Sequence, residues 1–327
     1  MISSINYSEP HYHIQKVSQS RGLGVSFCGH LGHETIKYLG KDMTLINETA
    51  FFRECETLNF LVDYLNKTFG SYKEKSIVVG ACSTGEEVYS IKMLLKNSPA
   101  KIIGIDLSPK AIEKAKSGVF QVSVPINGRT EHFLKINGIH AYSDGYLGAK
   151  NTLVLSEMEK KNLELFNGMF EQINADSFLY NLDSFCNFTR HKLGFNELFL
   201  GNKLFKLKLP QKDCSFMVGG IENITELLPE QKHHAITFRN ALYHIAANRQ
   251  QPLGRYIPRI EIVSNLDKLF KKINKSLYNS GLFIIGDHEQ KQGLDLNLIK
   301  TLMGSNGFKE IPQQHSESNI WQKVAEL

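Results

Sequence analysis

Apolar and polar stretches alternate along the chain in a way that predicts strands followed by helices. Within residues 76–97, a short apolar run from Ile77 to Val79 leads into a glycine-containing loop and then into apolar residues at helical spacing. Such a run is typical of a parallel strand that is covered on both faces. The apolar face of the helix consists of Val88, Ile91, Leu94 and Leu95. The rest of the chain is organised around this strand–loop–helix unit.

The helix of this unit begins at two overlapping capping boxes, Ser83 with Glu86 and Thr84 with Glu87. In each box a hydroxyl accepts a backbone N–H and the glutamate reaches back to the cap. The two glutamates occupy the positive end of the helix, where a nucleotide pyrophosphate would otherwise bind. The loop therefore favours a cofactor with a positive centre, namely S-adenosylmethionine. An ordinary capped helix in an α/β sheet explains the same pattern.

The next apolar run ends at an acidic residue, Asp106, which lies 21 positions after Gly85. A carboxylate roughly 20 residues beyond such a loop is placed to bind the ribose hydroxyls of a nucleotide. Ser108 and Pro109 then form a helix start, and Gly118 forms its end. The sequence therefore predicts Asp106 as a cofactor-binding residue.

The remaining elements continue the alternation. Helices are predicted over residues 49–70, 158–170, 176–193, 260–280 and 294–303. Strands are predicted over residues 203–209, 215–219, 235–240 and 282–286, with a closing antiparallel pair over 308–311 and 319–324. The predicted fold class is α/β, with a Rossmann-like, mostly parallel sheet and an antiparallel C-terminal strand.

Composition excludes several classes of protein. With 327 residues, 42% hydrophobic and 22% charged, the chain suits one large domain with an appendage, or two domains. Its five cysteines lack a CxxC pair, which favours a reducing cytoplasm and argues against a metal site. No apolar run is long enough to cross a membrane, and no signal peptide is predicted. The net charge of +5 comes without a basic run, so nucleic acid is not an expected partner.

Several short segments, taken together, resemble the chemoreceptor glutamate methyltransferases of the CheR type. The segments are Asn47 to Glu54 (NETAFFRE), Ala81 to Ser90 (ACSTGEEVYS), Asp106 with residues 113–118, Phe238-Arg239-Asn240 and, more weakly, Gly286-Asp287-His288-Glu289. They occur in the order of the family, whereas residues 121–212 contribute almost nothing. The resemblance implies the class I methyltransferase fold and S-adenosylmethionine as cofactor.

The resemblance also implies site residues. The candidate catalytic residues are Arg53, Tyr243 and His244; the candidate cofactor-binding residues are Asn47, Thr49, Arg53, Gly80, Ala81, Glu86, Asp106, Asn223, Ile224 and Asn240. Arg53 is expected near the carboxylate of the cofactor or of the methyl acceptor, because a guanidinium donates two parallel hydrogen bonds. The family has a tyrosine four residues after its asparagine, where this chain has His244 with Tyr243 beside it.

Two regions depart from the family. Residues 1–46 are polar and predicted to be a frayed or partner-dependent arm, where the family has a basic helical domain. After Phe120 the chain is longer than the family pattern, and a capping box at Ser156 suggests a helical insertion over about 150–205, beside the active-site mouth and outside the core sheet. The predicted domains are therefore 1–70, an arm and helix, and 71–327, the cofactor-binding domain with its insertion.

The leading functional hypothesis is a cytoplasmic methyltransferase that forms a glutamyl methyl ester on a protein, with the cytoplasmic region of a chemoreceptor as candidate partner. One alternative is a methyltransferase that acts on a small molecule or another acceptor outside chemotaxis. The other is a non-catalytic regulator that binds S-adenosylmethionine. Scattered histidines such as His233 and His234 are expected at the surface rather than in catalysis.

Overall fold

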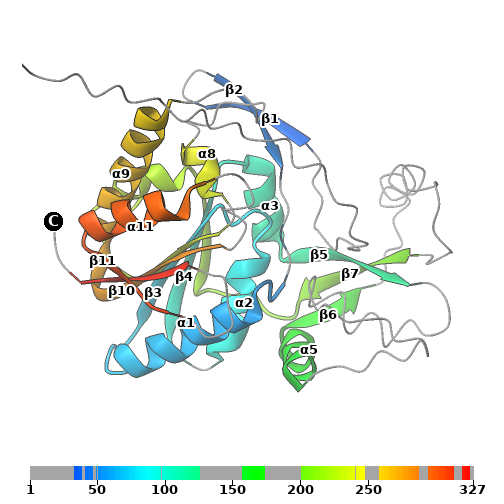
Figure 1. Ribbon diagram of the computed structural model, residues 1–327. Coiled ribbons are helices and arrows are strands. Elements are labelled where there is room, and N and C mark those ends of the chain that lie inside the picture. The colour runs from blue at the N-terminus through cyan, green and yellow to red at the C-terminus, as the bar shows by residue number, and fades with distance from the viewer. Residues whose placement is uncertain are drawn as a thin grey trace, which may run out of the picture.

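The computed structural model describes residues 33–38, 41–46, 49, 51–96, 98–125, 157–173, 200–239, 241–246, 258–286, 294–312 and 319–324. Most of them surround a seven-stranded sheet with the strand order β11-β12-β10-β9-β3-β4-β8 (Figure 1). The strands are β3 (Lys75–Gly80), β4 (Ala100–Asp106), β8 (Cys214–Val218), β9 (His233–Phe238), β10 (Leu277–Ile285), β11 (Phe308–Glu310) and β12 (Asn319–Lys323).

The pairing of these strands confirms the predicted fold class. The five strands from β8 to β10 are parallel to their neighbours, β12 pairs antiparallel with β10, and β11 pairs antiparallel with β12. The strand order reverses between β3 and β9, because the chain runs outward from β3 to β8 and then returns to β9. In open α/β sheets a ligand binds beyond the carboxyl ends of the strands at such a switch point.

Helices cover both faces of the sheet (Figure 1). One face packs against α1 (Cys55–Thr68), α2 (Glu86–Leu95) and α3 (Pro109–Ser117), and the other against α7 (Ile224–Leu227), α8 (Leu242–Ala246), α9 (Arg259–Ser276) and α11 (Leu296–Ser305). Strand side chains alternate between the two cores, as Val78 does against Ile77 and Val79. The apolar run of β3 is continuous because both of its faces are buried.

A separate three-stranded sheet corrects the prediction of a purely helical insertion. It has the order β5-β7-β6, from β5 (Val119–Pro125), β6 (Phe170–Ile173) and β7 (Leu200–Leu207), beside α5 (Glu157–Met169). All its pairs are antiparallel, and none joins the main sheet. The strand predicted over 203–209 belongs to this small sheet. Ser156 and the helix predicted over 176–193 lie outside the described residues.

Aromatic rings pack the small sheet and α5 against the segment that precedes α1. Phe51 contacts Phe120, Phe166 and Phe170 edge-on, with ring centroids 4.9, 5.1 and 5.3 Å away. Such pairs contribute roughly 0.5–1.5 kcal/mol each beyond the area that they bury. Phe51 comes from the segment before α1, so this segment lies between the two sheets.

The N-terminal region contains regular structure that the sequence pattern did not indicate. β1 (His33–Tyr38) and β2 (Lys41–Ile46) form an antiparallel hairpin, where an arm without regular structure was predicted. In Figure 1 the hairpin lies on the side of the main sheet where α3 begins. Residues 1–32 lie outside the described residues.

Several predicted boundaries need correction. α1 begins at Cys55, later than predicted, because Phe52 and Glu54 adopt left-handed backbone conformations that a helix does not contain. α9 ends at Ser276, and Gly281 lies inside β10 rather than ending the helix. No helix in the described part of the chain is long and apolar enough to cross a membrane.

His233 and His234 are buried at the amino end of β9, which contradicts their predicted surface position. His233 Nδ1 lies 2.8 Å from the Ser76 hydroxyl, and the Ser76 N–H donates to His234 Nδ1 over 2.9 Å. Burial lowers the pKa of His233 to about 4. The two histidines lie at the amino end of β9, whereas the switch point lies at the carboxyl ends of the strands. They pack against β3 as neutral rings.

Candidate active site

The predicted site residues that the structure describes lie at the carboxyl ends of the central strands. Gly80 ends β3, Asp106 ends β4, and Tyr243 and His244 belong to α8, which follows β9. Asn223 ends a short 3₁₀ helix, η1 (Ile221–Asn223), and Ile224 begins α7 directly after it. Asn47 and Asn240 lie outside the described residues.

Gly80 allows the carboxyl ends of β3 and β9 and the η1 turn to approach one another closely. A Cβ atom at this position would lie 2.9 Å from Ile221 Cγ1 and 3.0 Å from Phe238 Cδ2. Contacts this short are rare or absent for real Cβ atoms, so a side chain at position 80 would displace the Ile221 or Phe238 side chain. The glycine predicted to bind the cofactor therefore also serves the packing of the site itself.

Asp106 holds the loop between β3 and α2. Its Oδ2 accepts the Ser83 N–H over 2.8 Å, and its Oδ1 accepts the Ser108 N–H over 2.8 Å. Cys82 adds a backbone bond from its N–H to the Ile105 carbonyl at 3.1 Å. The two carboxylate oxygens thus hold the loop that follows β3 and the residue that caps α3.

The start of α2 differs from both predicted capping boxes. The N-cap is Gly85, with φ of 94°, and no side chain caps the helix. The Thr84 hydroxyl donates instead to Glu86 Oε2 over 2.6 Å. A Cβ on Gly85 would lie 2.9 Å from Ala115 Cβ, so the helix start packs against α3 through a glycine. The boxes do not form because Gly85 turns the chain and Glu87 is held elsewhere.

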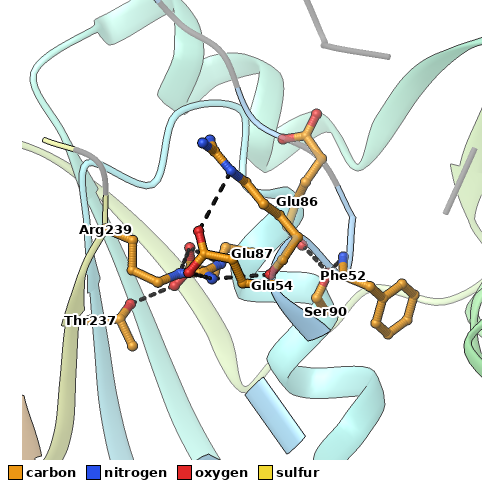
Figure 2. Close-up of polar contacts among 8 residues, drawn as sticks. Phe52, Glu54, Glu86, Glu87, Ser90, Thr237 and Arg239 are labelled. Carbon is orange, nitrogen blue, oxygen red and sulfur yellow. Dashed lines mark hydrogen bonds and ion pairs between the residues drawn. The ribbon is translucent and has the colours of Figure 1, made fainter. Parts of the chain in front are cut away.

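Glu86 is a buried acid. Glu86 is 3% exposed, and its side chain points away from the pair formed by Arg239 and Glu87 (Figure 2). Burial raises the pKa of Glu86 to about 7, although the hydrogen bond from Thr84 and the charge of Lys114 act in the opposite direction. Near neutral pH this carboxyl group is therefore present in both charge states.

Glu86 is expected to make the protein less stable as the pH rises. The folded state holds this proton more tightly than the unfolded state, whose pKa is near the ordinary 4.5. Its contribution is fully present below pH 4.5 and is lost as the pH rises through 7, a change on the order of 3 kcal/mol. Urea unfolding of Glu86→Gln should show a gain over wild type at pH 8 that shrinks at pH 5.

The matched control for this experiment is Glu113→Gln, which changes an exposed glutamate on α3. Glu113→Gln should follow the pH dependence of wild type. If Glu86→Gln also follows wild type at both pH values, then Glu86 does not titrate in this range in the folded protein.

Arg239 is the centre of a buried network at the switch point (Figure 2). Its Nε and Nη2 donate to Glu87 Oε2 over 3.0 and 2.8 Å, and its Nη1 lies 3.2 Å from Glu54 Oε2. Nη1 also donates to the Arg53 carbonyl over 3.0 Å, and the Thr237 hydroxyl donates to Glu87 Oε1 over 2.6 Å. Burial alone would lower the pKa of Arg239, but Glu87 and Glu54 raise it above its usual value.

This network changes the electrostatic interpretation of the helix start. Glu87 is neutralised by Arg239, and Glu86 is held partly protonated by burial. The two glutamates therefore do not present two unpaired negative charges to a ligand, as the sequence pattern suggested. The expectation of a positively charged cofactor loses that support and depends on the other features of the site.

The turn before α1 is strained and held from two sides. Phe52 and Glu54 have φ of 54° and 51°. In the loop between β3 and α2, Ala81 and Ser83 have φ of 52° and 50°. The Phe52 N–H donates to the Ser90 hydroxyl over 2.8 Å, and that hydroxyl donates to the Glu86 carbonyl over 2.7 Å. Left-handed non-glycine residues cost roughly 1–3 kcal/mol each and gather at functional sites.

Arg53 and Thr49 come from the segment that leads into this turn. The Arg53 side chain is 18% exposed, with its Nε 3.8 Å from Glu54 Oε1, and Thr49 is half-buried. Tyr243 and His244 are half-buried, with ring centroids 4.0 Å apart. The roles assigned to all these residues stay predictions. Sequence reasoning missed the structural role of Arg239 and Glu87, although both stood inside motifs that it quoted.

The same segments decide the comparison with known proteins. Residues 47–135 match the family model "CheR methyltransferase, SAM binding domain". The predicted resemblance is confirmed. The matched range contains the strained turn, the loop from β3 to α2 and Asp106, and it ends before α5.

Two curated relatives match part of the chain. The chemotaxis protein methyltransferase of Escherichia coli (strain K12) is 33% identical over 118 residues, which cover 32% of this chain and 40% of that protein. The chemotaxis protein methyltransferase of Campylobacter jejuni subsp. jejuni serotype O:23/36 (strain 81-176) is 36% identical over 99 residues. These residues cover 29% of this chain and 37% of that protein. The chain thus spans about two fifths of the length of these relatives.

Among solved structures, the N-methyltransferase NodS from Bradyrhizobium japonicum WM9 is 10% identical and has a TM-score of 0.36. The alignment covers 83% of this chain and 97% of that one.

Proposed function

We propose that the protein is an S-adenosylmethionine-dependent methyltransferase that esterifies glutamate side chains of a protein, with a chemoreceptor as the leading acceptor. The observation that carries the proposal is the position of the CheR-like segments. The loop after β3, Asp106 after β4 and the turn at Arg53 meet at the switch point of a class I sheet. The names of the matched relatives support the choice of a protein glutamate as acceptor.

The residues present fit such a cofactor. The Ser83 hydroxyl is buried beside Asp106 and, within the described part of the chain, has no hydrogen-bond partner. A buried hydroxyl without a partner is costly, so a polar ligand group at this place would satisfy it. We propose that Asp106 binds the ribose, that Gly80 and Ala81 allow close approach, and that Asn223 and Ile224 flank the adenine.

The proposed chemistry asks little of side chains. The bound cofactor supplies an electrophilic methyl group on a sulfonium. The acceptor carboxylate is already ionised at neutral pH, so the protein needs no general base. Arg53 can orient a carboxylate with two parallel hydrogen bonds, while Tyr243 and His244 line the acceptor side. Rate enhancement then comes from alignment and from exclusion of water.

Methyl transfer onto a chemoreceptor cytoplasmic fragment tests the acceptor. Purified protein is incubated with methyl-labelled S-adenosylmethionine and the fragment, and the product is treated with alkali. A glutamyl methyl ester should release its label as methanol under alkali, whereas a methylated amine would not. Label that enters only small molecules supports the small-molecule alternative. Cofactor binding without transfer to any acceptor supports the regulator alternative.

Asp106→Ala is expected to weaken the binding of S-adenosylmethionine. The loss of affinity should be about 1–3 kcal/mol, because ribose hydroxyls would lose a charged acceptor. Asp106→Asn should lose less, since its amide oxygen still accepts one bond. Isothermal titration calorimetry measures both variants against Asp63→Ala, which changes an exposed aspartate on α1. Unchanged affinity in Asp106→Ala would place the ribose elsewhere.

A further inference from the structure

An acidic side chain joins the β1–β2 hairpin to the residues that follow β4. Glu34, in β1, is 8% exposed, and its Oε2 accepts a hydrogen bond from the Ser108 hydroxyl. Ser108 itself is fully buried. A buried carboxylate loses its hydration, so it needs a donor that compensates for the loss. The contact therefore fixes the hairpin at one defined place.

Ser108 connects Glu34 to Asp106, the residue that is predicted to bind the ribose. Its N–H donates to Asp106 Oδ1 over 2.8 Å, and its hydroxyl oxygen accepts the Ala111 N–H over 3.0 Å as the cap of α3. Because that oxygen accepts from α3, its single proton is available for Glu34. The positive end of α3 also favours a carboxylate at this position. Glu34, Ser108 and Asp106 thus form one continuous set of contacts.

The hairpin continues into the strained turn at the other side of the site. The β1–β2 pairing places Glu34 opposite Leu45, close to the end of β2. Beyond β2 the chain is fixed again where the Phe52 N–H meets Ser90 and the Arg53 carbonyl meets Arg239. The hairpin and the strained turn are therefore each fixed by side-chain hydrogen bonds.

We propose that Glu34 is a positioning residue for the cofactor. Through Ser108 it holds the β1–β2 hairpin against the start of α3 and fixes the position of Asp106, so that this carboxylate is held in place before the cofactor binds. A carboxylate that is already held in place costs less entropy on binding than one that must be ordered. This inference depends on the proposed binding of S-adenosylmethionine.

The test compares cofactor binding by the full chain and its variants, using S-adenosylmethionine as the probe. Glu34→Ala should bind about tenfold more weakly and release the cofactor faster, because a charge-assisted hydrogen bond is lost. Glu34→Gln should recover most of the affinity, since its amide oxygen also accepts the Ser108 proton. Lys37→Ala, an exposed position on the same strand, should bind like wild type.

A double-mutant cycle isolates the contact from the cap that Ser108 also provides. In the Ser108→Ala background, Glu34→Ala should have little further effect on affinity. An equal loss in both backgrounds would overturn the inference. If Glu34→Ala does not fold, amide hydrogen exchange of wild type and Glu34→Gln replaces it. The cofactor should then increase protection of residues 33–46 in wild type, and the absence of that increase would also overturn the inference.

The remaining outcomes separate this inference from the proposed function. If wild type binds the cofactor and Glu34→Ala binds it equally well, Glu34 is not a positioning residue, while the cofactor assignment stands. A lower melting temperature of the cofactor-free Glu34→Ala protein with unchanged affinity leads to the same conclusion. If wild type does not bind the cofactor, both proposals are wrong.

Discussion

Replacing Arg239 by alanine is expected to cause the largest loss of stability among the variants considered. The free energy of unfolding should fall by about 3–5 kcal/mol, because removing one partner from a buried ion pair leaves the other charges buried and uncompensated. The guanidinium holds Glu87, Glu54 and the Arg53 carbonyl at once, and its side chain is 2% exposed. Urea unfolding measured at equilibrium gives the difference.

The second substitution in the network tests the cause. In the Arg239→Ala background, Glu87→Gln should restore part of the lost stability, since it removes an unpaired charge and its amide oxygen can still accept the Thr237 proton. Arg239→Lys should be more stable than Arg239→Ala but less stable than wild type, because it keeps the charge without the planar fork. Arg259→Ala, at an exposed arginine of α9, serves as the control. An Arg239→Ala loss no larger than this control would contradict the network.

Arg53 is expected to matter for turnover rather than for folding. If its guanidinium pairs with a carboxylate in the site, Arg53→Ala should reduce transition-state stabilisation by about 2–5 kcal/mol, as calculated from the fall in kcat/KM. Arg53→Lys should lose less than alanine, because it keeps the charge but not the fork. Methyl-transfer kinetics on the acceptor that the labelling experiment identifies would give these values.

The structure limits the cost of these Arg53 variants to the fold. Arg239 contacts the backbone carbonyl of Arg53, and the Arg53 side chain lies 3.8 Å from Glu54, a partly exposed pair that contributes little. Both variants should therefore melt within a few degrees of wild type. Full activity in Arg53→Ala would show that the arginine is an ordinary surface residue and that its role in the family does not carry over.

Local patterns predicted the elements whose cause is local. The apolar run of β3, the Ser108–Pro109 start of α3 and the Gly118 end were all found at the expected places. Ser108 accepts the Ala111 N–H, and Gly118 has φ of 61°, as these residue types require. The order of strands and helices followed from the same alternation, and it was enough to predict the fold class.

The features that were missed depend on contacts between distant parts of the chain. The predicted capping box of Thr84 with Glu87 failed because Glu87 is drawn to Arg239, 152 positions away. The histidines at the start of β9 are buried by pairing with Ser76, 157 and 158 positions away. A β-hairpin in a polar segment, held by Glu34 on Ser108, likewise leaves no periodic signal. No window of the sequence contains both partners of such contacts.

The separate sheet of β5, β6 and β7 has a consequence for how this chain can vary in length. Its backbone ladder shares no pairing with the seven-stranded sheet, so strand register in one sheet is independent of register in the other. All seven described strands of the main sheet lie outside residues 126–156 and 174–199. Insertions and deletions at these two positions should therefore leave the switch point intact, and they make these connections suitable places for a fused reporter domain.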